Sequence, residues 1–133
     1  MLEGSVTMAW CFDDEATPYT DGVRDRLADR QAVVPSLWPL EAANATIMGE
    51  RRKRLDEARS RRFFVLLAAL PIAVDDETRG RAFGDIVHLA RTYQLSAYDA
   101  AYIVLAEKLG AALVTRDARL ASASGHAAPV ELF

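Results

Sequence analysis

The chain has 133 residues, of which 51% are hydrophobic and 26% charged, and its formal net charge is -3. That length suits one compact domain with its own core and leaves no room for a second, so we expect a single domain over residues 1–133. The near balance of charges argues against a protein that coats nucleic acid by bulk positive charge. Local basic patches remain compatible with this composition.

Three features bear on the cellular compartment. Cys11 is the only cysteine, so no internal disulfide can form. The first residues lack the basic start and long apolar core of a secretory signal. The longest apolar run, 63–74, is interrupted by Pro71 and falls short of the ~20 residues that span a bilayer. We therefore expect a cytoplasmic protein that does not enter a membrane.

Short apolar runs rich in β-branched residues alternate with longer segments of helical period, which predicts an α/β domain with a mainly parallel sheet. In chain order, strands are expected up to Glu3 and at 32–34, 72–74, 111–114 and 130–133. Helices are expected after Ser5, after Pro18, at 36–48, 55–70, 83–93 and 96–109, and after Asp117.

Local signals set several helix ends and faces. Ser36 and Pro39 supply cap and first-turn signals, and Pro71 stops the helix at 55–70. Ser96 opens the helix that ends near Leu109, with Gly110 just beyond it. Two buried helix faces are predicted, the first formed by Leu40, Ala43, Ile47 and Met48 and the second by Phe83, Ile86, Val87, Ala90 and Tyr93.

Four acidic residues fall where the expected strands and helices meet, namely Glu3, Glu41, Asp99 and Asp117. Glu3 ends the first strand, and Glu41 lies in the first turns of the helix after the second. Asp99 begins a helix, and Asp117 follows the strand at 111–114. Ligands gather at the carboxyl ends of parallel strands, so we expect these side chains to converge.

Converging carboxylates raise one another's pKa values unless a divalent cation neutralises them. All-oxygen donors favour Mg²⁺ or Mn²⁺, which can orient water and stabilise the charge that develops on a phosphodiester. Each acid also has a local interpretation. Asp99 could form half of a capping box with Ser96, Asp117 could cap the next helix, and Glu41 could complement a helix N-terminus. Glu3 could be a solvated terminal residue, so only the joint pattern favours a metal site.

Four segments together resemble the PIN-domain family, in particular the VapC-type toxin ribonucleases of VapBC toxin–antitoxin pairs. They are LEGSVTMAWCF at 2–12, VPSLWPLEAANA at 34–45, LSAYDAAYIVLA at 95–106 and LVTRDARL at 113–120. The resemblance implies a central, mainly parallel sheet of four to five strands with helices on both faces. It also implies hydrolysis of single-stranded or loop RNA with bound Mg²⁺ or Mn²⁺, within a type II toxin–antitoxin system, and a small antitoxin as partner.

Carried over by position, the metal-binding acids of the family fall on Glu3, Glu41, Asp99 and Asp117. The small hydroxyl positions near the metal fall on Ser5 and Thr115. Asp99 and Glu3 are expected to hold the main metal, with Glu41 and Asp117 completing its shell directly or through water. Glu3 departs from the Asp that is usual in the family and adds one methylene to a site that needs close octahedral geometry.

Two alternatives stay open on this evidence. The first is a PIN domain that binds an antitoxin but has lost catalysis through Glu3 and a short first strand. The second is a phosphoacceptor receiver domain, suggested by the acidic pair Asp13 and Asp14. Against it, the pair does not follow the first strand, and Lys108 lies within a predicted helix instead of beyond the last strands.

A basic stretch and the apolar helix faces suggest partner surfaces. Arg51, Arg52 and Arg54 could line an RNA path or meet an acidic partner segment, although such a run is often only a solvated helix face. Glu57 and Arg61 are spaced to pair along a helix, which absorbs some of the neighbouring charge. The apolar stripes of the early helices lead us to expect a homodimer.

Overall fold

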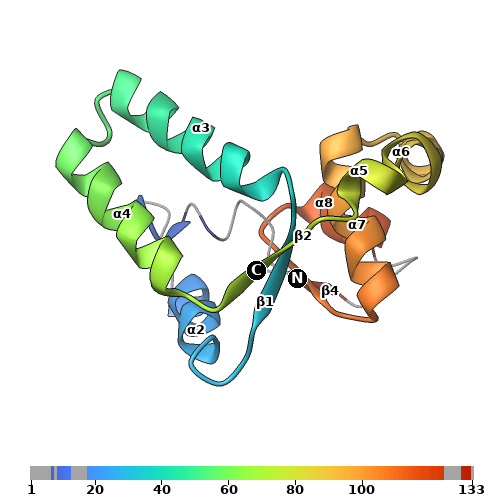
Figure 1. Cartoon of the computed structure of the whole chain (residues 1–133), viewed down its shortest axis with the longest axis horizontal. Coiled ribbons are helices and arrows are strands. Elements are labelled where there is room, and N and C mark those ends of the chain that lie inside the picture. Colours follow the sequence, from blue (N-terminus) through green and yellow to red (C-terminus); the bar gives the residue numbers. More distant parts are fainter. Residues whose placement is uncertain (1–6, 8, 13–17, 125–129, 133) are drawn as a thin grey trace.

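The computed structural model describes residues 7, 9–12, 18–124 and 130–132, with backbone alone at 19–20 and 130–132 (Figure 1). The elements in chain order are α2 (Pro18–Arg26), β1 (Ala32–Pro35), α3 (Trp38–Arg51), α4 (Glu57–Ala69), β2 (Ile72–Asp75), α5 (Thr78–Arg81), the π-helical turn η1 (Ala82–Ile86), α6 (Val87–Tyr93), α7 (Ala97–Leu109), β3 (Leu113–Thr115), α8 (Ala118–Ser124) and β4 (Val130–Leu132).

The strands pair in parallel, which confirms the predicted α/β class. β1 runs beside β2 with Ala32 opposite Ile72, and β3 runs beside β4 with Leu113 opposite Val130. Within the described residues the strands form these two pairs and not one continuous sheet. The predicted strand that ends at Glu3 lies outside the described residues. Because parallel strands need crossover connections, helices separate the members of each pair in sequence.

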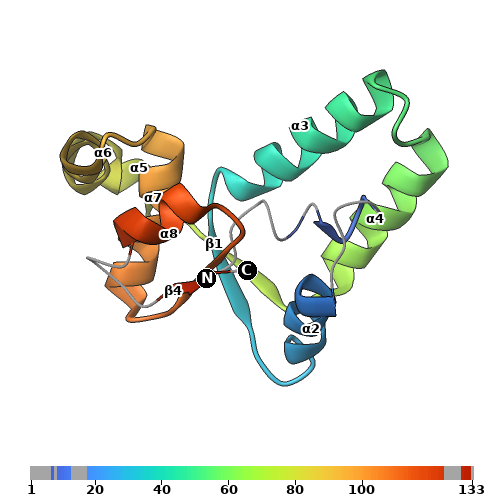
Figure 2. The same cartoon turned by 180° about the vertical axis from the view of Figure 1, so that it is seen from behind.

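Helices lie on both sides of the strands. In the two opposite views, α3 and α4 form a hairpin on one side of β1 and β2, and α5 to α8 lie on the other (Figures 1 and 2). The connection between α3 and α4 is the part of this hairpin farthest from α7 and α8. Across the described ranges, no helix combines the length and apolar character needed to cross a bilayer.

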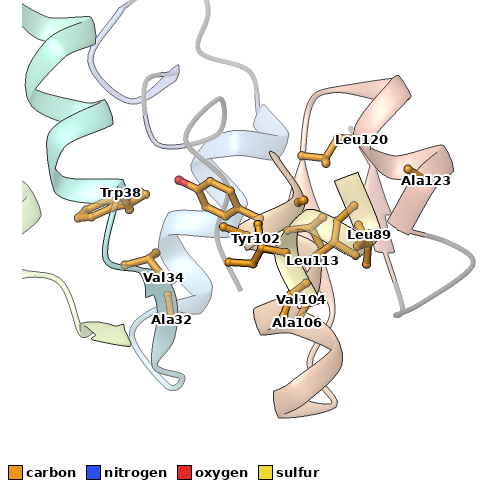
Figure 3. Packing of buried hydrophobic residues seen from close by; sticks show 14 of the residues in the cluster. Ala32, Val34, Trp38, Leu89, Tyr102, Val104, Ala106, Leu113, Leu120 and Ala123 are labelled. Carbon is orange, nitrogen blue, oxygen red and sulfur yellow. The ribbon is translucent and has the colours of Figure 1, made fainter. Parts of the chain in front are cut away.

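The core is built around α7. Every residue from Ala100 to Ala106 is buried, so this helix is surrounded by protein on all faces. It packs against β1 and β3, and Figure 3 shows its side chains beside Val34 and Leu113. Ser96 caps its N-terminus, and Gly110 ends it in the left-handed conformation, with φ of 60°, as predicted. Because the middle of α7 is packed in the core, the backbone of its first turn, which carries Asp99, is held in a fixed position.

The predicted buried face of α3 is wrong. Leu40 and Ile47 are 75% and 43% exposed, and the buried residues of the helix are Trp38, Ala42, Thr46 and Gly49. Gly49 lies on the inner face, close to Phe12. A Cβ at this position would come within 2.8 Å of the Phe12 ring, so only glycine fits without a shift. Periodicity alone favoured the face with larger aliphatic residues, whereas close packing selected the face with a small residue.

Two further local predictions are corrected. Ser36 does not cap α3: the helix begins after Leu37 without a side-chain cap, and the Ser36 backbone N–H donates to Thr78 Oγ1 at 3.3 Å. Phe83 is 96% exposed, whereas Ile86 in the same π-helical turn is buried as predicted. The wider turn of a π-helix changes the angle between successive side chains, so spacing based on an α-helix misplaces Phe83.

Candidate metal centre

Asp99 lies in the first turn of α7. Its backbone N–H donates to Ser96 Oγ at 3.0 Å, so the predicted capping contact is present. That contact uses the main chain of Asp99 and leaves its carboxylate available for other partners. The side chain is 26% exposed and directly precedes the buried segment Ala100–Ala106 of the helix. The buried body of α7 therefore holds an acidic group at an accessible position.

Asp117 lies in the turn between β3 and α8. Its Oδ1 accepts from the backbone N–H groups of Arg119 at 2.9 Å and Leu120 at 3.1 Å, so the predicted helix cap is present. Its own backbone N–H donates to Oγ1 of the fully buried Thr115 at 3.0 Å. These bonds fix the backbone and one carboxylate oxygen. The second oxygen, Oδ2, faces the side chain of Arg119.

Arg119 brings the two aspartates together. Its Nη2 lies 3.0 Å from Asp99 Oδ2 and 3.9 Å from Asp117 Oδ2. The nearer contact is also a hydrogen bond, in which the guanidinium donates to the Asp99 carboxylate. Two acids from different elements, α7 and the β3–α8 turn, therefore share one cation. This is the convergence that the positions of Asp99 and Asp117 at the sheet edge led us to expect.

Glu41 lies in the first turn of α3, across from α7. Tyr102 Oη donates a hydrogen bond of 2.5 Å to Glu41 Oε1. Tyr102 is buried and follows Asp99 by three residues, so the two side chains lie on neighbouring turns of one helix face. In Figure 3 the hydroxyl end of Tyr102 points toward the start of α3, where Trp38 lies. The carboxylate of Glu41 is thus held at the hydroxyl end of Tyr102, whose backbone lies about one turn along α7 from Asp99.

The family model described as "PIN domain" matches residues 1–125. The chain belongs to the PIN-domain family. A search of the solved structures finds a likeness to "Crystal Structure of PAE2754 from Pyrobaculum aerophilum", with a TM-score of 0.69 and 23% identity over 97% of this chain and 86% of that one. At that identity the likeness shows the fold alone. No curated protein matches the sequence.

PIN domains are generally metal-dependent nucleases that bind RNA and often antitoxins. Membership of the family removes the receiver-domain alternative and confirms the predicted fold class. Asp99 and Asp117 supply carboxylate oxygens, which Mg²⁺ and Mn²⁺ prefer as ligands. Both carboxylates already lie within 4 Å of one positively charged nitrogen, Arg119 Nη2.

The number of gathered donors is smaller than predicted within the described part of the chain. There, no three His, Cys, Asp or Glu side chains are grouped closely enough to hold a metal. Two carboxylates are nevertheless compatible with Mg²⁺, which often uses one or two, with waters and substrate phosphates as its other ligands. Glu3 and Ser5, which complete the predicted set, lie outside the described residues. The two gathered carboxylates, Asp99 and Asp117, therefore fit Mg²⁺ or Mn²⁺ as a two-carboxylate site.

The basic stretch lies apart from these acids. Arg51, Arg52 and Arg54 are exposed at the end of α3 and in the following loop. At 1.5 Å per residue, Arg51 is about 15 Å along α3 from Glu41. Arg54 stacks over the Phe12 ring, with its guanidinium carbon 4.1 Å from the ring centre. The stretch therefore lies at the opposite end of α3 from Glu41.

Two residues that contact the acids of the site, Arg119 and Tyr102, were not predicted from the sequence. Arg119 follows Asp117 by two positions in a helix start, where a basic side chain carries no distinctive signal. Tyr102 follows Asp99 by three positions, and that spacing could have placed it on the same helix face. Its partner, Glu41, is 61 residues away in sequence. This pair is brought together by the fold, through a hydrogen bond between residues of α3 and α7.

Proposed function

We propose that this PIN domain, acting as a single domain over residues 1–133, is a Mg²⁺- or Mn²⁺-dependent endoribonuclease and the toxin of a type II toxin–antitoxin pair. The observation that carries the proposal is the convergence of Asp99 and Asp117 on one cationic nitrogen. A position that gathers two carboxylates around a positive charge is suited to a divalent cation.

The proposed roles follow the positions of the acids. Asp99 and Glu3 hold the main metal, and Asp117 and Glu41 complete its surroundings directly or through water. Ser5 and Thr115 are supporting hydroxyls. Support for the role of Thr115 comes from its hydrogen bond with the Asp117 backbone, which fixes the turn that carries this acid.

A divalent metal, when bound, would orient water and neutralise the charge that develops on the phosphodiester. Hydrolysis joins the oxygen of water to phosphorus, breaks one bridging P–O bond and transfers a proton to the leaving oxygen. The chain itself supplies carboxylates that are already positioned. Two backbone N–H groups hold Asp117 Oδ1, and Tyr102 holds Glu41 Oε1. Such fixed groups need little rearrangement during the reaction.

The proposal is tested with the purified chain and a pool of cellular RNA. We expect cleavage with Mg²⁺ or Mn²⁺, loss of cleavage when EDTA removes the metal, and recovery when Mn²⁺ is added back. Duplex RNA and single-stranded DNA of matched sequence serve as competing substrates and should be cleaved more slowly. Cleavage that continues in EDTA, or none with either metal, would contradict the proposal.

The impaired PIN domain remains the second candidate, because Glu3 replaces the Asp that is usual in the family. If the natural site is active, Glu3→Asp should raise Mn²⁺ affinity and the cleavage rate by less than about tenfold. Changes that disrupt the surroundings of a metal typically alter these quantities by about 10- to 100-fold, so a smaller gain means that Glu3 does not impair the site. Both quantities are measured on the same preparation. Glu57→Asp, an identical change at an exposed position on α4, is the matched control. A gain of roughly a hundredfold in both quantities would favour the impaired alternative.

The proposed protein partners are a small antitoxin and a second copy of the chain. Support comes from exposed apolar side chains on the α3–α4 hairpin, namely Leu40, Ile47, Phe64 and Val65. Arg51, Arg52 and Arg54 are the proposed contacts for RNA or an acidic segment of a partner. Expressing the chain with and without the adjacent upstream reading frame tests the antitoxin role. Growth arrest should occur only without that frame.

A further inference from the structure

We propose that Arg119 is an intramolecular competitor for the metal: its guanidinium occupies the space between Asp99 and Asp117 in the metal-free protein and leaves when a divalent cation binds. This inference rests on the metal site of the proposed function. It adds a residue that sets the affinity of the site without being a ligand.

The contacts of Arg119 place its charge where a metal would be needed. The same nitrogen, Nη2, is 3.0 Å from Asp99 Oδ2 and 3.9 Å from Asp117 Oδ2. A divalent ion shared by these oxygens would lie close to that nitrogen, since metal–oxygen distances are only about 2.0 to 2.1 Å for Mg²⁺. Two cations at such a separation repel strongly. Metal binding and the Arg119 contacts therefore exclude each other.

Arg119 can leave without disturbing the fold. Its side chain is 65% exposed, so the guanidinium can move into solvent. Its backbone N–H, in contrast, donates to Asp117 Oδ1 and belongs to the cap of α8. The side chain thus moves while its anchor stays beside the acidic pair. When the metal dissociates, the guanidinium remains close enough to return.

The ion pairs of Arg119 with Asp99 and Asp117 are weak enough for a divalent cation to replace the guanidinium. Ion pairs between exposed side chains are weak, because water screens them and ordering the side chains costs entropy. A guanidinium held this loosely lowers metal affinity without preventing binding. It also keeps the two carboxylates together in the metal-free protein, where they would otherwise repel. Arg119 therefore raises the concentration of divalent cation at which the site becomes half occupied.

The experiment measures Mn²⁺ binding to the full chain by isothermal titration calorimetry, without RNA. Arg119→Gln should bind Mn²⁺ about two- to fivefold more tightly than the unmodified chain, in line with the modest strength of an exposed ion pair. Arg119→Lys keeps a cation with poorer geometry and should fall between them. Arg61→Gln removes another exposed 3.0 Å ion pair, with Glu57 on α4, and should leave the affinity unchanged.

Thermal unfolding provides a second readout. Arg119→Gln should lower Tm slightly without metal and show a larger rise in Tm with saturating Mn²⁺ than the unmodified chain. Equal or weaker Mn²⁺ binding by Arg119→Gln would overturn the inference. The proposed metal site itself would still stand if, alongside that result, the unmodified chain binds Mn²⁺ and Asp99→Asn does not. Absence of Mn²⁺ binding by both the unmodified chain and Arg119→Gln would overturn the inference and the proposed site together.

Discussion

Asp99→Asn is expected to abolish metal-dependent RNA cleavage, with a loss of at least about 100-fold, because altered metal surroundings alone cost 10- to 100-fold. The change removes the negative charge that one of the two gathered carboxylates contributes, while Asn keeps its size. The fold should persist, since the capping bond to Ser96 uses the Asp99 backbone N–H and not its side chain. Cleavage rates and circular dichroism of the same preparation check both parts.

A matched variant separates the site from general charge effects. Asp85→Asn removes a carboxylate that pairs with Lys108 at 3.1 Å, in η1 and outside the candidate metal centre. It should cleave RNA at the rate of the unmodified chain. Full cleavage by Asp99→Asn would show that Asp99 is not part of the catalytic site.

Tyr102→Phe is expected to lower the free energy of unfolding by about 1.5 to 3 kcal/mol, the usual range for a hydrogen bond to a charged group. The ring stays in the core, so the loss reports the contact between Tyr102 Oη and Glu41 Oε1. Cleavage should fall as well, because Glu41 loses the group that orients it. Urea unfolding and cleavage rates measure the two effects.

The control for this variant is on the same helix. Tyr98 is 68% exposed, so Tyr98→Phe should change the free energy of unfolding by no more than about 0.5 kcal/mol. A double-mutant cycle of Tyr102→Phe with Glu41→Gln should show non-additive effects, as expected for residues in contact. Equal stability of the two tyrosine variants would mean that the hydroxyl of Tyr102 contributes nothing measurable.

Much of the fold was predictable because local signals agree with it. β-branched runs gave the strands β1, β2 and β3 near their observed positions, and Pro71 ended the helix before β2. Ser96 and Gly110 bound α7 as expected. The inner face of α3 was not predictable, since it depends on the contact between Gly49 and Phe12, which are far apart in sequence.

The candidate site also has one part that the sequence predicted and one part that it did not. The approach of Asp99 and Asp117 followed from a general rule, that the carboxyl ends of parallel strands and the helix starts beside them meet at one edge. The partners of these acids did not follow. Arg119 and Tyr102 acquire their roles through contacts with residues distant in sequence, Asp99 for Arg119 and Glu41 for Tyr102, which no single segment of the sequence determines.

The most direct measurement is anomalous X-ray scattering at the manganese edge from crystals of the full chain soaked in Mn²⁺. We predict a peak within coordination distance of both Asp99 and Asp117, with the guanidinium of Arg119 displaced from these carboxylates. Well-ordered crystals with no peak at that position, and with Arg119 still bridging the two aspartates at saturating Mn²⁺, would contradict the proposed metal centre.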